Sequence, residues 1–214
     1  MKLYVISGLG ADKTVFENIV FPEKFSEIIF IDWLIPETEE TFEHFVKRMA
    51  KPIDEKEKFC LLGYSFGGIM VQEINKLKPA EKIVILGSIK SQKEMSVTFH
   101  LAKKSKIFSK IPESYFGEKT LKSYAFFRKL FDPKNPKFWR YFVVQNPHYL
   151  KWSINKILDW KCEENPDVIQ ILADKEIVFP PKNSKPDFVI KGGTHLFPVT
   201  KHKEVSKILK EVFS

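Results

Sequence analysis

A serine, a pair of acids and a histidine occur in an order that suits nucleophilic catalysis. Ser65 lies between two glycines in Gly63-Tyr64-Ser65-Phe66-Gly67, Asp174 and Glu176 come about a hundred residues later, and His195 follows them. A serine hydroxyl is a weak nucleophile at neutral pH unless a base takes its proton, and imidazole titrates in the right range. An acid must then accept the second imidazole N–H and fix the tautomer. We therefore expect Ser65 to be a nucleophile and His195 its base.

The serine stands where a predicted strand meets a predicted helix. Residues 58–64 are mostly apolar, and a helical pattern covers residues 66–78. A strand, a sharp turn and a helix are the context in which Gly-x-Ser-x-Gly forms a nucleophile elbow. Gly63 and Gly67 let the strand and the helix approach closely around a strained serine. This context favours an elbow over a chance match in a glycine-bearing turn.

The elements that must position these residues alternate along the chain. Apolar runs separated by helical patterns predict an α/β fold whose strands pair in parallel. Ser65 follows the third predicted strand, the acidic pair follows the fifth, and His195 follows the sixth. Open α/β sheets place their sites at the carboxyl ends of strands, so these residues are expected to meet there. The predicted strands cover residues 3–7, 27–33, 58–64, 82–88, 166–173 and 187–191. A short helix is expected at residues 14–20, and the prolines within residues 180–186 predict a loop or single turn between the last two strands.

Residues 91–160 interrupt this alternation. The segment is rich in aromatic residues, lacks strand-like runs of valine and isoleucine, and is cut by several prolines into pieces that suit short helices. Pockets commonly lie between a scaffold and an inserted piece. We therefore expect residues 1–90 and 161–214 to form an α/β core. Residues 91–160 are expected to form a helical cap, with an apolar underside that packs on the core and lines a pocket.

The chain resembles the α/β-hydrolase superfamily over essentially its whole length. The resemblance rests on the elbow at residues 63–68, on residues 171–180 around the acidic pair, and on residues 192–198 around His195. The order serine, acid, histidine is the chain order of this superfamily. The resemblance implies a compact α/β-hydrolase fold with a roughly six-stranded, mainly parallel sheet and a helical cap. It further implies an esterase-like serine hydrolase that forms an acyl-enzyme on Ser65 and needs no metal or organic cofactor.

The resemblance also implies roles for three further residues. Alignment with the family's segment places Glu176 as the acid, but Leu172 and Ala173 stand where the family usually has His-Gly, so Asp174 remains the alternative. An oxyanion needs two backbone N–H donors, one from the residue after the nucleophile and one from the loop after the first strand. These donors are expected to be Phe66 and Leu9.

The same residues suit more than one activity. An ester or related acyl bond of a small molecule is the expected substrate, with water as the acceptor. An acyltransferase that uses the same residues is the first alternative, because fold and site do not by themselves choose the acceptor. A noncatalytic protein that binds a small ligand in the retained pocket is the second.

Charge and cysteine content bear on partners and location. The net charge is +8 over 214 residues, and residues 91–160 alone carry 14 basic and 5 acidic residues. Only 3 of the 35 basic residues are arginine, whereas nucleic-acid recognition favours the guanidinium, so we expect no nucleic-acid partner. A solvated lysine face is expected, with steering of an anionic substrate as the alternative.

Two cysteines without metal-ligand spacing, Cys60 and Cys162, are expected to be reduced thiols. The amino-terminal apolar run is too short for a signal peptide or a membrane span. We therefore expect a cytoplasmic protein without a membrane span, and the sequence does not indicate its oligomeric state.

Overall fold

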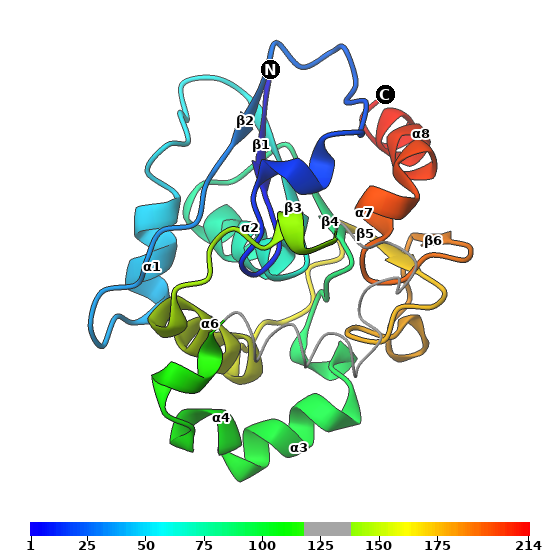
Figure 1. The fold of residues 1–214 in the computed structure, drawn as a ribbon. Coiled ribbons are helices and arrows are strands. Elements are labelled where there is room, and N and C mark those ends of the chain that lie inside the picture. The colour runs from blue at the N-terminus through cyan, green and yellow to red at the C-terminus, as the bar shows by residue number, and fades with distance from the viewer. Residues whose placement is uncertain (118–137) are drawn as a thin grey trace.

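A six-stranded parallel sheet forms the centre of the molecule (Figure 1). The computed structural model describes residues 1–117 and 138–214. Each strand pairs with its neighbours in parallel, in the order β2-β1-β3-β4-β5-β6. The predicted α/β class and six-stranded, mainly parallel sheet are thereby confirmed. The strands are β1 (Lys2–Ile6), β2 (Glu27–Phe30), β3 (Phe59–Tyr64), β4 (Lys82–Leu86), β5 (Val168–Ala173) and β6 (Phe188–Ile190).

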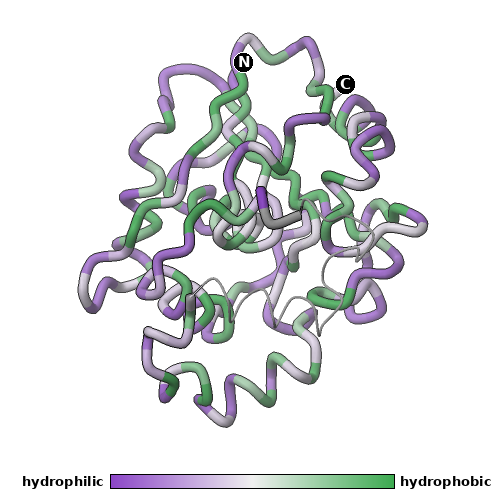
Figure 2. The backbone as a smooth tube through the Cα atoms, viewed as in Figure 1, coloured by the Kyte–Doolittle hydropathy of each residue, from purple (hydrophilic) through white to green (hydrophobic). Residues whose placement is uncertain are grey.

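The strands are apolar because both faces of the sheet are covered. Successive side chains of a strand point to opposite faces. Tyr4 and Ile6 therefore belong to one buried cluster, with helices α1 (Phe42–Met49) and α2 (Phe66–Leu77), while Leu3 and Val5 belong to another. The second cluster includes residues of the 3₁₀ helix η1 (Lys13–Phe16) and of α8 (His202–Val212). Figure 2 shows the hydrophobic residues concentrated along the central strands.

Two predicted elements are shorter in the structure. The second strand was expected to reach Trp33 but ends at Phe30. The N–H of Ile31 still bonds to Val5 at 2.9 Å, but β1 ends at Ile6, so the chain beyond has no neighbouring strand with which to pair. A helix was expected at residues 14–20, but only the 3₁₀ helix η1 forms there. The shorter second strand leaves irregular chain, which includes Trp33, beyond the carboxyl end of β2.

The described part of the predicted cap is helical. Helices α3 (Val97–Ser105), α4 (Ile107–Lys110) and α6 (Pro147–Asp159) lie together beyond the lower end of the sheet in Figure 1. The side chain of Asn146 caps α6, which packs on the core: the Trp152 ring lies 4.5 Å from that of Phe45. Short 3₁₀ helices η2 (Gln92–Glu94), η3 (Glu113–Phe116) and η4 (Phe138–Tyr141) also form in the described part of this segment. Predicted cap residues 118–137 lie outside the described residues.

The last quarter of the chain returns to the sheet. Between β5 and β6 the chain makes a single short turn, η5 (Pro181–Asn183), as its prolines predicted. After β6 come α7 (Phe197–Thr200) and α8. No helix in the described residues is both long and apolar enough to cross a bilayer.

Candidate active site

Ser65 occupies a sharp turn between β3 and α2. Its backbone angles are φ 53° and ψ −118°, a left-handed conformation that is unusual for a residue other than glycine. The turn is held by two hydrogen bonds, from the Ser65 N–H to Leu86 at 2.8 Å and from the Gly68 N–H to Ser65 at 2.9 Å. The surrounding structure thus maintains a strained conformation of the kind that clusters at functional sites.

The glycines on either side of Ser65 permit this turn because backbones approach very closely there. A Cβ atom added to Gly63 would lie 2.3 Å from the carbonyl oxygen of Gly67. A Cβ added to Gly67 would lie 2.3 Å from the carbonyl oxygen of Ile6 in β1. No larger residue fits either position without moving the backbone. The Gly-x-Ser-x-Gly pattern therefore reflects the packing of β3, α2 and β1 against one another.

His195 lies on the loop after β6 and contacts the serine. Its Nε2 lies 2.9 Å from the Ser65 Oγ, and the ring is largely buried. The Tyr64 hydroxyl donates a hydrogen bond to the His195 carbonyl at 2.9 Å and so holds the histidine loop against β3. Burial, with the nearby Glu176 carboxylate, raises the pKa of Tyr64 well above its usual range, so this hydroxyl stays protonated and able to donate. The base is therefore positioned by the residue that precedes the serine.

Glu176 contacts the other side of the imidazole. Its Oε2 lies 2.6 Å from the His195 Nδ1, and the carboxylate is buried. Its Oε1 accepts backbone hydrogen bonds from Val178 at 2.7 Å and from Phe179 at 3.4 Å. Charged acceptors with such backbone donors are held firmly, so the carboxylate has one orientation toward the imidazole. Ser65, His195 and Glu176 thus form one continuous chain of hydrogen bonds.

Asp174 has a different environment. It is exposed, and its Oδ1 accepts a hydrogen bond from the N–H of Gly192 at 2.7 Å. This contact joins the loop after β5 to the turn after β6. The structure brings Glu176, and not Asp174, against His195.

The two expected N–H donors, Leu9 and Phe66, flank the serine. Leu9 and Gly10 form the middle of a tight turn closed by the Ala11 N–H, which bonds to Gly8 at 3.0 Å. Gly10 has φ +70°, as a type II turn requires at its third residue. A Cβ added to Gly8 would lie 3.3 Å from that of Ser65, so this turn lies directly beside the serine.

Phe66 begins α2, where N–H groups lack partners within the helix. Neither the Leu9 nor the Phe66 N–H donates to another protein atom in the described part of the chain.

Four aromatic residues around the site were not predicted. Tyr64 holds the histidine loop, and the Phe179 ring meets the His195 ring edge-on at 6.2 Å. Trp33 and Tyr149 contact the Gly8–Ala11 turn. For Trp33 a signal was present, since a tryptophan followed an apolar run at the carboxyl edge of the sheet. For Tyr149 the sequence offers none, because its contact depends on how α6 docks.

The described residues include one cluster with metal-ligand chemistry, formed by Glu37, Glu40 and His44. A guanidinium nitrogen of Arg48 lies 2.7 Å from Glu40 and 3.6 Å from Glu37. The arginine therefore supplies the positive charge that a metal ion would bring. Because Arg48 already neutralises the two glutamates, the cluster fits a metal ion poorly.

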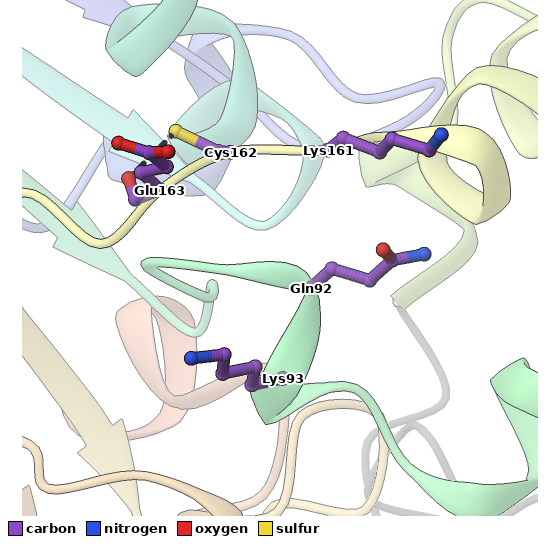
Figure 3. Close-up of a pocket in the computed structure, with 5 residues that line it drawn as sticks. All are labelled: Gln92, Lys93, Lys161, Cys162 and Glu163. Carbon is purple, nitrogen blue, oxygen red and sulfur yellow. Dashed lines mark hydrogen bonds between the residues drawn. The ribbon is translucent and has the colours of Figure 1, made fainter.

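A cavity of about 300 Å³ opens elsewhere (Figure 3). Its lining contains none of Ser65, Glu176 and His195. In it the Cys162 thiol donates to the carbonyl of Glu163 at 3.1 Å. Cys162 and the buried Cys60 are both free thiols, as predicted. The lining residues are Gln92, Lys93, Lys161, Cys162 and Glu163.

No protein-family model matches the chain, and no curated protein matches it significantly. Solved structures do resemble it. A lipase-esterase related protein from Clostridium acetobutylicum is 17% identical, with a TM-score of 0.64, and the match covers 99% of this chain and 93% of the other.

Two further structures match over similar lengths. A Bacillus megaterium epoxide hydrolase is 13% identical, with a TM-score of 0.68, and the match covers 99% of this chain and 93% of that one. The type II thioesterase BorB from the borrelidin biosynthetic cluster is 10% identical, with a TM-score of 0.63, and the match covers 100% and 92%. At these identities the likeness concerns the arrangement of the backbone.

Proposed function

The chain has the α/β-hydrolase fold, and we propose that it is a serine hydrolase that cleaves an ester or related acyl bond of a small molecule. One observation carries the proposal: the hydrogen-bonded series Ser65–His195–Glu176 at 2.9 and 2.6 Å, at the carboxyl ends of β3, β5 and β6. These groups have the chemistry that acyl transfer to a serine needs.

Each group has a role in the proposed reaction. The Ser65 Oγ attacks the acyl carbon while the His195 Nε2 takes its proton, and Glu176 stabilises the imidazolium that forms. The N–H groups of Leu9 and Phe66 donate to the oxyanion of the tetrahedral intermediate. His195 then returns the proton to the leaving alkoxide, which leaves an acyl-enzyme on Ser65. Water, deprotonated by His195, attacks this ester and forms a second tetrahedral intermediate. Its collapse breaks the bond to the Ser65 Oγ, which takes the proton back from His195, and the carboxylic acid is released.

A fluorophosphonate probe followed by peptide mass spectrometry tests the proposal. We expect the label on Ser65 in the wild type and in the control variant Ser109→Ala, whose serine is exposed on α4. No label is expected in Ser65→Ala. Absence of label from the wild type, or equal labelling of Ser65→Ala, would disprove nucleophilic catalysis at this serine.

Hydrolysis of p-nitrophenyl esters of increasing acyl length identifies the acyl group. The described cap packs aromatic residues toward the core near the histidine loop, for example Phe99 with its ring 5.7 Å from that of Phe179, which supports an apolar acyl group. Repeating the series at high salt separates electrostatic steering from apolar recognition, because salt screens only the former.

A further inference from the structure

Trp33 contacts both segments that carry the proposed oxyanion donors. Its indole N–H donates a hydrogen bond to the carbonyl oxygen of Gly8 at 2.9 Å. Its ring stacks on that of Phe66, with centroids 4.8 Å apart and planes 7° from parallel. The side chain is buried, so the hydrogen bond is shielded from water. One residue from the chain after β2 therefore links the turn after β1 to the start of α2.

The contact with Gly8 bears directly on the Leu9 N–H. The carbonyl of Gly8 and the N–H of Leu9 belong to the same peptide unit, which is planar. A hydrogen bond that fixes the direction of the carbonyl therefore fixes the direction of the N–H on the opposite side. The only other hydrogen bond to this carbonyl in the described residues comes from the Ala11 N–H at 3.0 Å, within the same turn. Trp33 is thus the partner that ties this peptide to the rest of the protein.

We propose that Trp33 is a positioning residue that aims the Leu9 N–H at the oxyanion and, through the ring stack, keeps it in register with the Phe66 N–H. The inference rests on the proposed hydrolase function. Oxyanion stabilisation depends on donors that are already oriented before charge develops. A peptide free to rotate would cost transition-state stabilisation while leaving substrate binding nearly unchanged.

The variant Trp33→Phe removes the indole N–H and keeps an aromatic ring. Trp152→Phe is a matched control, because the Trp152 indole N–H also donates to a buried backbone carbonyl, that of Glu40, at 2.9 Å. Loss of an oxyanion donor typically costs about a hundredfold or more in kcat, and misorientation costs part of that. We expect kcat of Trp33→Phe to be about tenfold or more below that of Trp152→Phe, with KM of the two within about twofold.

A second variant tests the same point if Trp33→Phe does not fold. Replacing Trp33 with benzothienylalanine keeps the size and shape of the ring but exchanges the N–H for sulfur. The same fall in kcat is expected. The inference would be overturned if either Trp33 variant had the same kcat as the Trp152→Phe control.

Crystal structures of both variants give a readout that does not depend on activity. The Gly8–Leu9 peptide is expected to rotate in the Trp33 variant and to keep its orientation in Trp152→Phe. An unchanged peptide in the Trp33 variant overturns the inference even if the protein proves to be no hydrolase. Failure of the proposed function would be recognised separately, because Ser65→Ala would then hydrolyse esters at the wild-type rate. In that case the orientation of the Gly8–Leu9 peptide in the crystal structures would still test the role of Trp33.

Discussion

The hydroxyl of Tyr149, on the cap helix α6, accepts a hydrogen bond from the backbone N–H of Gly10 at 3.3 Å. Gly10 directly follows the proposed donor Leu9. The carbonyl oxygen of Gly10 accepts two further hydrogen bonds from the predicted cap segment, from the N–H groups of Val143 at 2.7 Å and Val144 at 2.9 Å. Burial raises the pKa of Tyr149, so its hydroxyl stays protonated. The segment predicted to form the cap therefore holds the turn beside the serine as well as covering the core.

Tyr149→Phe is expected to lower both stability and turnover. The change leaves the buried Gly10 N–H without its partner, which costs about 1–3 kcal/mol in the free energy of unfolding. It also loosens the turn that carries Leu9, so we expect kcat to fall severalfold. Tyr141→Phe is the control, because the Tyr141 hydroxyl makes a hydrogen bond to Glu17, at 3.4 Å, and does not touch the turn. Urea denaturation and ester hydrolysis measure the two effects, and equal kcat in both variants would contradict the prediction.

Glu176→Gln and Asp174→Asn form a matched pair, since each exchanges a carboxylate for an amide. Only Glu176 contacts His195, and losing that charge removes the group that stabilises the imidazolium. We expect kcat to fall by about a thousandfold or more in Glu176→Gln and by less than about threefold in Asp174→Asn. Steady-state hydrolysis of the best ester measures both. A large loss in Asp174→Asn alone would show that the acid has been misassigned.

Gly63→Ala is expected to be among the most damaging single-methyl additions. The added Cβ would lie 2.3 Å from the Gly67 carbonyl oxygen, and both groups are backbone-anchored, so β3 or α2 must shift. Overpacking typically costs about 1–3 kcal/mol in the free energy of unfolding, and we expect the upper end of that range here because both clashing groups belong to the backbone. At Gly117 the nearest such contact among the described residues is 4.0 Å away, and Gly117→Ala should be close to neutral. Thermal unfolding of the two variants tests the difference, and similar melting temperatures would refute it.

Glu94→Gln should stabilise the protein at alkaline pH. Burial raises the pKa of Glu94, although hydrogen bonds from the Lys90 N–H and the Gln170 amide oppose this, and the charge of Glu164 reinforces it. A carboxyl whose pKa is higher in the folded state holds its proton longer there, so its contribution to stability falls as pH rises through the folded pKa. A neutral glutamine escapes that loss.

Melting temperatures at pH 4 and pH 8 measure this effect. The melting temperature of Glu94→Gln should exceed that of the wild type by more at pH 8 than at pH 4, with a difference of a few degrees. The exposed Glu211→Gln on α8 should show no such difference between the two pH values. A gain of equal size at both pH values would mean that ionisation of Glu94 is not the cause.

The sequence by itself determined the sheet and the order of its chemistry. Strands such as β3 and β4 can be predicted from their continuous apolar runs, because strands buried on both faces need no polar residues. The turn at Ser65 can be predicted from its flanking glycines for a similar reason, since only glycine fits where β3, α2 and β1 meet. Local composition is sufficient for such features because each depends on burial or crowding at one place in the chain.

Only the tertiary structure decided which side chains meet. Asp174 and Glu176 are two residues apart, and their roles diverge because one carboxylate turns to the Gly192 N–H and the other to His195. The sequence predicted Trp33 within a strand, whereas the end of β1 frees that residue to reach Gly8. Such contacts join residues far apart in the chain. Their geometry depends on how several elements pack at once, which no single stretch of sequence encodes.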